Sequence, residues 1–201
     1  MSKISEVEMC NLALSHVGLG ELIQSLDDDT TPARQCKLLF TPTAIDLLIR
    51  YNWSFAERKQ YLALLDGVSP VDYTYAYTYP SDCLRFREIY NSLSLKSPPI
   101  KYAIQLSADN KSRYIETNQA TAIGVYTVDV SDKASSWSEF FTMAFIWGMA
   151  MKLVIPLTRN SKMIQAVSGL AEVNIAQMVG LDLNEDYESF EEYNGFTAVR
   201  K

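Results

Sequence analysis

Residues 72–89 constrain the fold of this chain more than any other segment. Tyrosines alternate with small residues over its first half, at Tyr73, Tyr75, Tyr77 and Tyr79. Alternate side chains of an extended strand point to the same side, so the four rings are expected on one face. The segment therefore predicts a β-strand with an unusually aromatic face.

Pro80 follows the tyrosines directly. It has no backbone N–H to donate, so it is expected to end the strand. A second alternation of side chains begins beyond it and predicts a returning strand. One face of that strand carries Leu84, Phe86 and Glu88, and the other carries Arg85, Arg87 and Ile89.

The tyrosine face has three interpretations. It packs inside the protein as a core or inter-strand face, or it meets a protein partner, because tyrosine is enriched at protein interfaces. The third interpretation is a stacking platform for a sugar or for single-stranded nucleic acid. The sequence shows no basic groove of the kind that accompanies base stacking, so this interpretation ranks last.

Composition is that of a folded globular protein with one substantial core. The chain has 201 residues, of which 48% are hydrophobic and 21% charged. Its net charge is −6, which argues against a protein that binds nucleic acid by neutralising phosphates. Much of the acidic excess lies at the end, where residues 181–201 hold six Asp and Glu against Arg200 and Lys201.

Helical patterns precede the tyrosine segment. A first helix is predicted from Ser5 to Val17, because Ser5-Glu6-Val7-Glu8 fits a capping box and Gly18 and Gly20 stop it. A second helix is predicted from Pro32, capped by Thr31, to about residue 51. Pro42 lies inside this second pattern and predicts a kink or a break.

Helical patterns return after residue 133. Ser136-Trp137-Ser138-Glu139 fits a second capping box, opening a helix that is apolar nearly all round until Pro156. A last helix is predicted from Ser161 to Val179, with Gly180 as its stop. Strand patterns between the two helical regions lie near residues 73–79, 84–90, 99–105, 112–117 and 123–130.

This order predicts an α+β fold, mainly a helical bundle with a small β-rich lobe inserted between its second and third helices and an extended C-terminal tail. The predicted parts are N-terminal helices of the bundle at 1–63, the β-rich insertion at 64–133, C-terminal helices of the bundle at 134–180 and an acidic C-terminal extension at 181–201.

Few residues are suited to catalysis or metal binding. His16, the single histidine, lies on the predicted stripe of the first helix, and no nucleophile elbow or phosphate loop is present. Asp27-Asp28-Asp29 lacks the alternation of an EF-hand and reads as a solvated turn. Glu191-Glu192 lies in a polar segment where nothing would raise the pKa of an acid. We therefore predict a protein that is not an enzyme and has no metal or cofactor.

The sequence also predicts the compartment. Three cysteines without a C-x-x-C pair are typical of buried thiols in a reducing compartment, and the N-terminus lacks the apolar core of a signal peptide. The most apolar run, Phe140 to Met151, is twelve residues and about 18 Å long as a helix, shorter than a bilayer core of about 30 Å. A soluble protein made in a cytoplasm, with no membrane partner, is expected.

Several segments together resemble the tail tubular protein A family, the head-to-tail adaptors of podoviruses. The opening from Asn11 to Gly18, followed by an acidic loop, matches the family, as does the Trp53-Ser54-Phe55-Ala56 segment. The pattern Tyr77-x-Tyr79-Pro80-x-Asp82-Cys83-Leu84-Arg85 extends the likeness. The matching segments cover about the first ninety residues, and beyond them only the layout agrees. Ser54 stands where the family often has Asn.

The resemblance implies a structural virion protein, assembled in the host cytoplasm, that forms a ring of about twelve copies between the portal and the tail nozzle. Tail fibres would attach to this ring, and DNA would pass its lumen without specific binding. An acidic protein suits such a conduit because it repels DNA. On this view Tyr73, Tyr75, Tyr77 and Tyr79 are candidates for contacts with the next subunit, the nozzle or a fibre.

The C-terminal segment supplies the candidates for portal docking. Phe190, Tyr193 and Phe196 recur at intervals of three in an acidic segment, and Arg200 and Lys201 follow. The aromatic residues could fill pockets on a partner, with the charges at the rim. Alternatively, Phe190 and Tyr193 pack onto the chain's own helices.

Two other functional classes stay open at this point. One is a tail-associated hydrolase that acts on polysaccharide or cell wall, which requires a pocket with convergent carboxylates. The other is a monomeric carbohydrate-binding module that uses the Tyr73–Tyr79 face.

Overall fold

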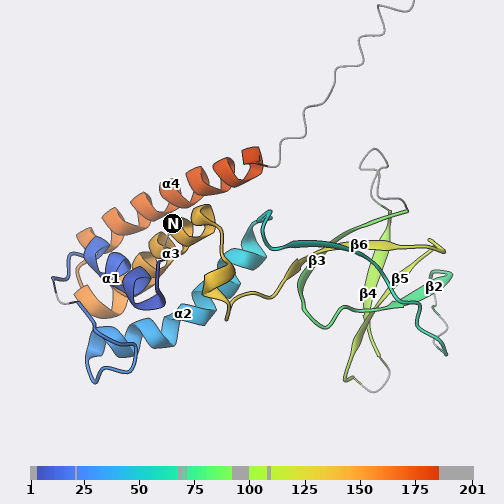
Figure 1. The fold of residues 1–201 in the computed structure, drawn as a ribbon, viewed down its shortest axis with the longest axis horizontal. Coiled ribbons are helices and arrows are strands. Elements are labelled where there is room, and N and C mark those ends of the chain that lie inside the picture. Colours follow the sequence, from blue (N-terminus) through green and yellow to red (C-terminus); the bar gives the residue numbers. More distant parts are fainter. Residues whose placement is uncertain are drawn as a thin grey trace, which may run out of the picture.

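The computed structural model describes residues 4–20, 22–67, 70, 72–91, 100–107 and 110–185. These residues form four α-helices and two small antiparallel sheets, so the protein is of mixed α+β class. The helices lie together at one end of an elongated molecule and the sheets at the other, as Figure 1 shows. We call these two ends the helical part and the β part.

Helix α3 is the centre of the helical part, because each of the other three helices packs against it. Half of its residues are buried, including the rings of Phe141 and Phe145. Trp53, which follows the second helix, adds an edge-to-face contact to Phe141 at 5.0 Å between ring centroids. The helices are α1 (Glu6–His16), α2 (Thr31–Arg50), α3 (Glu139–Thr158) and α4 (Ser161–Glu185).

Helix α3 is also the one helix of the described residues that is long and apolar enough to cross a membrane by length and composition. The helix is longer than the twelve-residue apolar run from Phe140 to Met151, because it begins at Glu139 and continues to Thr158. Within the protein, 56% of its most apolar window is buried, and a core helix passes the same test of length and composition.

The helix ends follow side-chain capping. Ser5 and Glu8 form the predicted capping box of α1, and Gly18 adopts a φ of 80° just after its end. Helix α2 begins one residue before the prediction, because Thr30 rather than Thr31 accepts the hydrogen bond from the Ala33 backbone. The cap of α3 is Ser138 and not Ser136, because residues 134–136 form a short 3-10 turn before it.

At three further positions the helices differ from the prediction. Helix α2 runs without a break through Pro42, where the helix loses one donor but continues to Arg50. Pro156 likewise lies inside α3, which ends two residues later where Arg159 adopts a left-handed conformation. Gly180 does not stop α4, which continues to Glu185 and buries the side chain of Asp182.

The β part consists of two three-stranded antiparallel sheets. One has the strand order β1-β6-β3 and the other β2-β5-β4. Their apolar faces share a second core, separate from that of the helical part, around Phe86, Ile115 and Tyr126. The strands are β1 (Glu57–Tyr61), β2 (Tyr75–Thr78), β3 (Cys83–Tyr90), β4 (Tyr102–Leu106), β5 (Arg113–Thr117) and β6 (Ile123–Val128).

Two differences from the predicted strands have a clear cause. Strand β1 is polar and exposed along most of its length, so it carries no apolar alternation, yet it pairs with β6 along its whole length. In β3 the predicted faces fail because the register with β6 shifts between Phe86 and Glu88. This bulge adds one residue, so Phe86 and Ile89 are both buried instead of lying on opposite faces.

Candidate functional site

The tyrosine segment is the first candidate site, and its four rings have different surroundings. Only residues 75–78 form strand β2, which ends before Pro80 as predicted. Tyr77 is 2% exposed and donates a hydrogen bond from its hydroxyl to the backbone oxygen of Gln119 at 2.6 Å. Tyr77 is therefore part of the β core. Tyr73 and Tyr75 are half-buried and present part of their surface to solvent.

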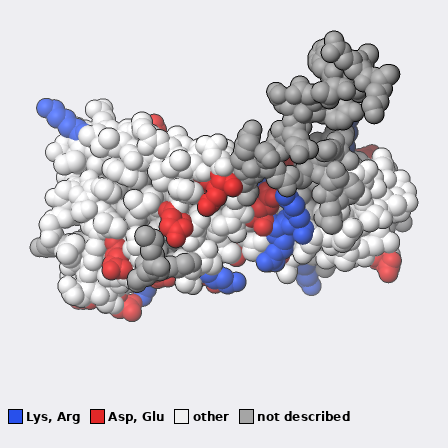
Figure 2. All heavy atoms as spheres, turned by 45° about the horizontal axis from the view of Figure 1, so that its top comes forward, with Lys and Arg blue, Asp and Glu red and all other residues white. Residues whose placement is uncertain are grey.

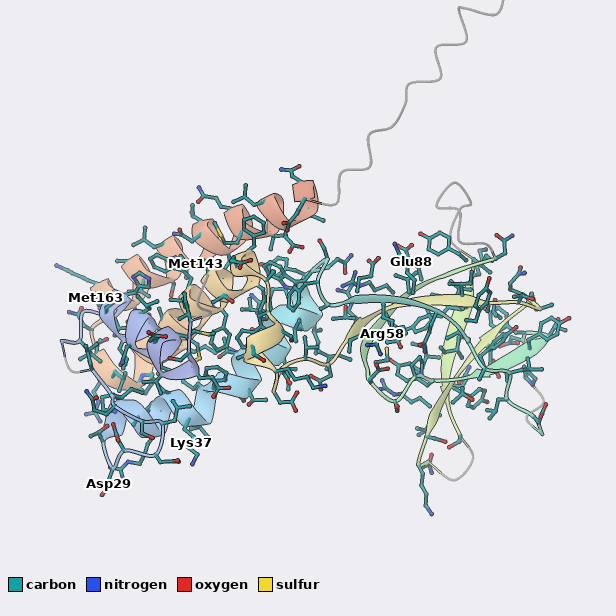
Figure 3. All side chains as sticks on the ribbon, viewed as in Figure 1. Asp29, Lys37, Arg58, Glu88, Met143 and Met163 are labelled. Atoms are coloured by element: carbon teal, nitrogen blue, oxygen red, sulfur yellow. The ribbon has the colours of Figure 1, made fainter. Side chains whose placement is uncertain are left out.

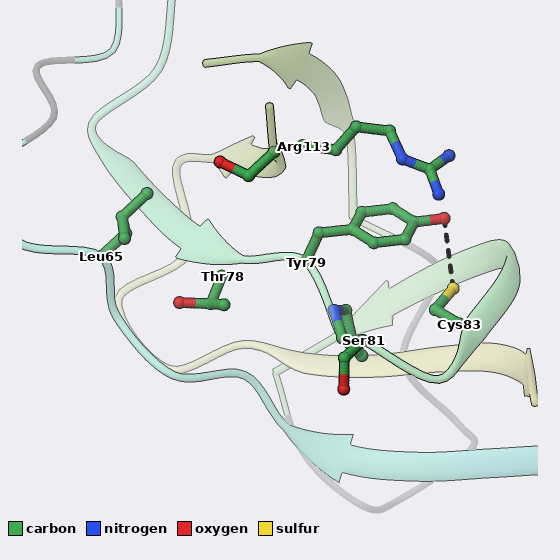
Figure 4. A pocket seen from close by; sticks show the side chains of 8 residues that line it. Leu65, Thr78, Tyr79, Ser81, Cys83 and Arg113 are labelled. Carbon is green, nitrogen blue, oxygen red and sulfur yellow. Dashed lines mark hydrogen bonds between the residues drawn. The ribbon is translucent and has the colours of Figure 1, made fainter. Parts of the chain in front are cut away.

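Tyr79 forms one wall of a pocket at the surface of the β part, shown in Figure 4. The Arg113 guanidinium lies 4.1 Å from the centre of its ring, and the Cys83 thiol donates to its hydroxyl at 3.2 Å. Burial and the bond from Cys83 raise the pKa of Tyr79 above its usual range, so the hydroxyl stays protonated. The pocket holds about 340 Å³ and is lined by Leu65, Thr78, Tyr79, Pro80, Ser81, Cys83, Ser112 and Arg113.

A second candidate lies where the helical part meets the β part. The side chain of Asp182, near the end of α4, accepts hydrogen bonds from the backbone and the hydroxyl of Ser54, both at 2.8 Å. Arg85 donates to the backbone oxygen of Ile49, the second-last residue of α2. These bonds fix the direction in which the chain leaves the helical part.

Arg87 completes this junction from strand β3. Its buried guanidinium pairs with Glu57 at 2.8 Å, donates to Thr127 Oγ1 at 2.9 Å and approaches the backbone oxygen of Trp53 at 3.4 Å. Burial lowers the pKa of Arg87, and Glu57 opposes that effect. The group is thus a structural ion pair that ties β1, β3 and β6 to the helical part.

Of the other titratable groups singled out in the sequence, Glu191 and Glu192 lie outside the described residues, and the single histidine has an aromatic partner. The ring of His16 stacks on that of Trp147 at 4.0 Å, and burial lowers the pKa of His16. His16 lies at the edge of the core and not on its buried stripe. Cys10, Cys36 and Cys83 are buried free thiols.

The acidic turn lies at the far end of the helical part. Figure 3 shows Asp29 and Lys37 at its outer edge, far from Arg58 and Glu88 in the β part. Asp27 pairs with Lys37 at 2.6 Å, and Asp28 accepts bonds from the backbone of residues 24 and 25. Among the described residues, no three His, Cys, Asp or Glu side chains gather in a group that could hold a metal ion.

The predicted docking residues lie outside the described part of the chain, which ends at Glu185. They are Phe190, Tyr193, Phe196, Arg200 and Lys201. Sequence reasoning missed Asp182 and Arg87, because Asp182 was assigned to the acidic extension and Arg87 to the strand face opposite Leu84 and Phe86. The available signal for Asp182 was a carboxylate flanked by two leucines.

A comparison of the chain with models of protein families finds no match, and neither does a comparison with curated proteins.

Proposed function

We propose that this chain is a structural virion protein, a ring-forming head-to-tail adaptor of a short-tailed phage. In this proposal the helical part is a bundle with the β part inserted between α2 and α3. About twelve copies close into a ring beneath the portal and above the tail nozzle. DNA leaves through the lumen without specific binding, and tail fibres attach to the outside.

The position of the family-like motifs supports this proposal most directly. Trp53 and Ser54 form the junction between the helical part and the β part, where Trp53 is fully buried and Ser54 bonds to Asp182. Tyr77 and Cys83 are buried in the β core. Trp53, Ser54, Tyr77 and Cys83, which belong to the motifs that carry the resemblance, thus hold the subunit in shape, as a scaffold protein requires.

The surface is consistent with the same role. Figure 2 shows one face of the molecule on which residues other than Asp, Glu, Lys and Arg predominate, with a row of acidic side chains and a group of basic side chains beside that row. A ring subunit needs apolar contact area on its sides, and negative charge near a lumen repels DNA and lets it slide.

Electron microscopy of phage particles that carry this chain tests the proposal. The expected result is a closed ring of this chain directly beneath the portal. A tail map that lacks such a ring would contradict it. The isolated protein is a weaker test, because rings of this kind can require the portal as a template.

The C-terminal segment is proposed to dock onto the portal through Phe190, Tyr193 and Phe196, with Arg200 and Lys201 at the rim. Deleting residues 187–201 should leave the melting temperature unchanged and prevent attachment to portal-bearing heads. A lowered melting temperature would show instead that the segment packs on its own subunit. Infectious particles built from the truncated chain would exclude both roles.

Carbohydrate binding is a second candidate function, favoured by the pocket beside Tyr79. Its wall combines the Arg113 cation with the hydroxyls of Thr78, Ser81 and Ser112. Acidic monosaccharides match this chemistry, since a guanidinium binds a carboxylate in two places. Titration of the labelled protein with glucuronate, followed by NMR, should shift the Tyr79 and Arg113 signals if this function holds. Unchanged signals in the wild type would exclude it, and Arg113→Ala is the control in which the Tyr79 signal should not shift.

A further inference from the structure

Helix α4 carries an exposed face that is apolar or small along most of its length. Between residues 163 and 181 its single charged side chain is Glu172. With 3.6 residues per turn, one exposed side of the helix combines Gly169, Leu170, Val173, Ala176, Gln177 and Leu181. Leu170 is 54% and Val173 57% exposed. We call this side the α4 face.

Glycine stands at two positions on this side of α4, Gly169 and Gly180, where no close contact within the subunit requires it. A Cβ placed on Gly169 or Gly180 would meet no atom within 4 Å, and neither glycine has a positive φ. Glycine inside a helix destabilises it relative to alanine. A structural reason for retaining small residues at such positions is the close approach of another backbone from outside the subunit.

Helix α2 carries a second apolar stripe, made by the exposed Leu38, Pro42 and Ile49 and the half-buried Ile45 at intervals of four, three and four residues. We call it the α2 face. In Figure 1, α2 and α4 lie on opposite sides of the helical part, with α3 between them, and both pack on α3 with their other sides. The α2 face and the α4 face therefore point away from each other.

The charges of the two helices are complementary. Helix α2 carries three cations and one carboxylate, whereas α4 carries one cation and, besides the buried Asp182, two carboxylates. Two of the α2 cations, Arg34 and Lys37, pair with Asp29 and Asp27 in exposed bridges, which hold them only weakly. Glu172 and Glu185 have no ion pair within the described residues.

We infer that the α4 face of one copy binds the α2 face of the next copy of this chain. Two different faces on opposite sides give a head-to-tail contact, which every further copy can repeat, whereas a two-fold contact would use one face twice. The small residues of α4 let the bulkier α2 side chains approach its backbone. This inference rests on the proposed ring, because it names the two surfaces through which neighbouring subunits of that ring touch.

Chemical cross-linking tests the inference. Val173→Cys places an exposed thiol on the α4 face, and Thr41→Cys places one beside the α2 face, while the three native cysteines are buried. The purified full chain at high concentration, and particles that incorporate it, are treated with a short bismaleimide. The chain with both substitutions should give a ladder of two, three and more copies. A mixture of the two single variants should stop at two copies.

Three results would overturn the inference. One is a self-cross-link of Val173→Cys alone as strong as that of the mixture, which indicates a two-fold contact. Another is equal cross-linking of Leu106→Cys, a control on β4 whose side chain is exposed to the same 54% as Leu170. The third is the absence of any ladder in both the concentrated protein and the particles.

The remaining alternative is that the chain's own C-terminal segment covers the α4 face. Reaction of the monomer with a monofunctional maleimide tests this alternative. If Val173→Cys is protected in the monomer and becomes reactive after deletion of residues 187–201, the chain's own C-terminal segment covers the α4 face, and the inference is overturned. A ladder without a ring beneath the portal would contradict the proposed function alone. A ring in which the double variant gives no ladder would contradict the surface assignment alone.

Discussion

Asp182 and Ser54, 128 positions apart in the sequence, are joined by two hydrogen bonds of 2.8 Å that hold the end of α4 against the start of the β part. Asp182 is buried, and its second carboxylate oxygen has no partner among the described residues. One side chain thus connects the last helix to the point where the chain leaves α2 for β1.

Replacing Asp182 with alanine should destabilise the protein by about 1–3 kcal/mol, because the N–H of the half-buried Ser54 loses its acceptor. Asp182→Asn should cost less, since an amide oxygen can still accept from Ser54 while its NH₂ takes the place of the unpartnered oxygen. Urea unfolding measures both. Glu185→Ala, on the exposed end of the same helix, is the control and should change little. Equal loss in the alanine and asparagine variants would contradict the role given to this bond.

Trp53 should be among the most costly residues to truncate. It is fully buried, donates from Nε1 to the backbone oxygen of Leu47 at 3.0 Å and contacts Phe141. We expect Trp53→Ala to lower the free energy of unfolding by about 3–5 kcal/mol. Trp53→Phe should lower the free energy of unfolding by less, because phenylalanine keeps an aromatic contact with Phe141 although it loses the hydrogen bond to Leu47. A soluble alanine variant with an unchanged melting temperature would show that the core assignment is wrong.

Arg87→Met should destabilise the β part more than Arg87→Lys. Removing one partner of a buried ion pair costs about 3–5 kcal/mol, and the lower end applies here because Glu57 is partly exposed. Lysine keeps a charge for Glu57 but does not offer the fork that also reaches Thr127. A double-mutant cycle with Glu57→Gln, read by thermal unfolding, isolates the pair. A coupling energy of zero would mean that Arg87 stabilises the β part through its other hydrogen bonds and its packing, and not through Glu57.

The sequence predicted the elements well where a single periodicity or cap decides the structure. The capping box at Ser5, the strand that ends before Pro80 and the apolar α3 all follow from local chemistry. Strand β1 was not predictable in this way. Its polar residues are held by pairing with β6, more than sixty positions away, so the relevant information is not local.

The candidate site was less accessible to sequence reasoning. The alternation of the tyrosines is real, but only the tertiary fold places Tyr77 in the core while leaving Tyr73 half-buried. The bulge in β3 reverses the face of Ile89 without leaving a sequence signal that differs from a regular strand. The stripe of Leu38, Pro42, Ile45 and Ile49, in contrast, has a helical period that was open to recognition, but the buried stripe of the same helix concealed it.

Protonation of His16 should make stability depend on pH between neutral and mildly acid conditions. Burial lowers the pKa of His16 in the folded protein below the value of 6.5 that it has when unfolded. The unfolded chain therefore binds the proton more readily. The contribution of neutral His16 to the stability of the folded protein is fully present above pH 6.5 and is lost as the pH falls toward the pKa of His16 in the folded protein. His16→Phe keeps the stacking on Trp147 and should give a flatter profile in urea unfolding. Identical slopes in the two proteins would contradict this assignment.

Two glycines should respond to alanine in opposite directions. At Gly169 the new methyl group enters open space, so alanine should stabilise the isolated subunit by about 0.5–1 kcal/mol through its better helix propensity. At Gly124 in β6 it would lie 2.8 Å from Leu62 and 2.9 Å from the buried ring of Phe86, so alanine should destabilise through overpacking by about 1–3 kcal/mol.

Urea unfolding of the two variants measures both effects, and the cross-linking assay adds a second readout for Gly169→Ala. A subunit that becomes more stable but cross-links less with its neighbours places the need for glycine outside the subunit, on the α4 face. If Gly169→Ala destabilised the monomer, the glycine would serve the fold of its own chain. The close approach of a neighbouring helix would then lose its support.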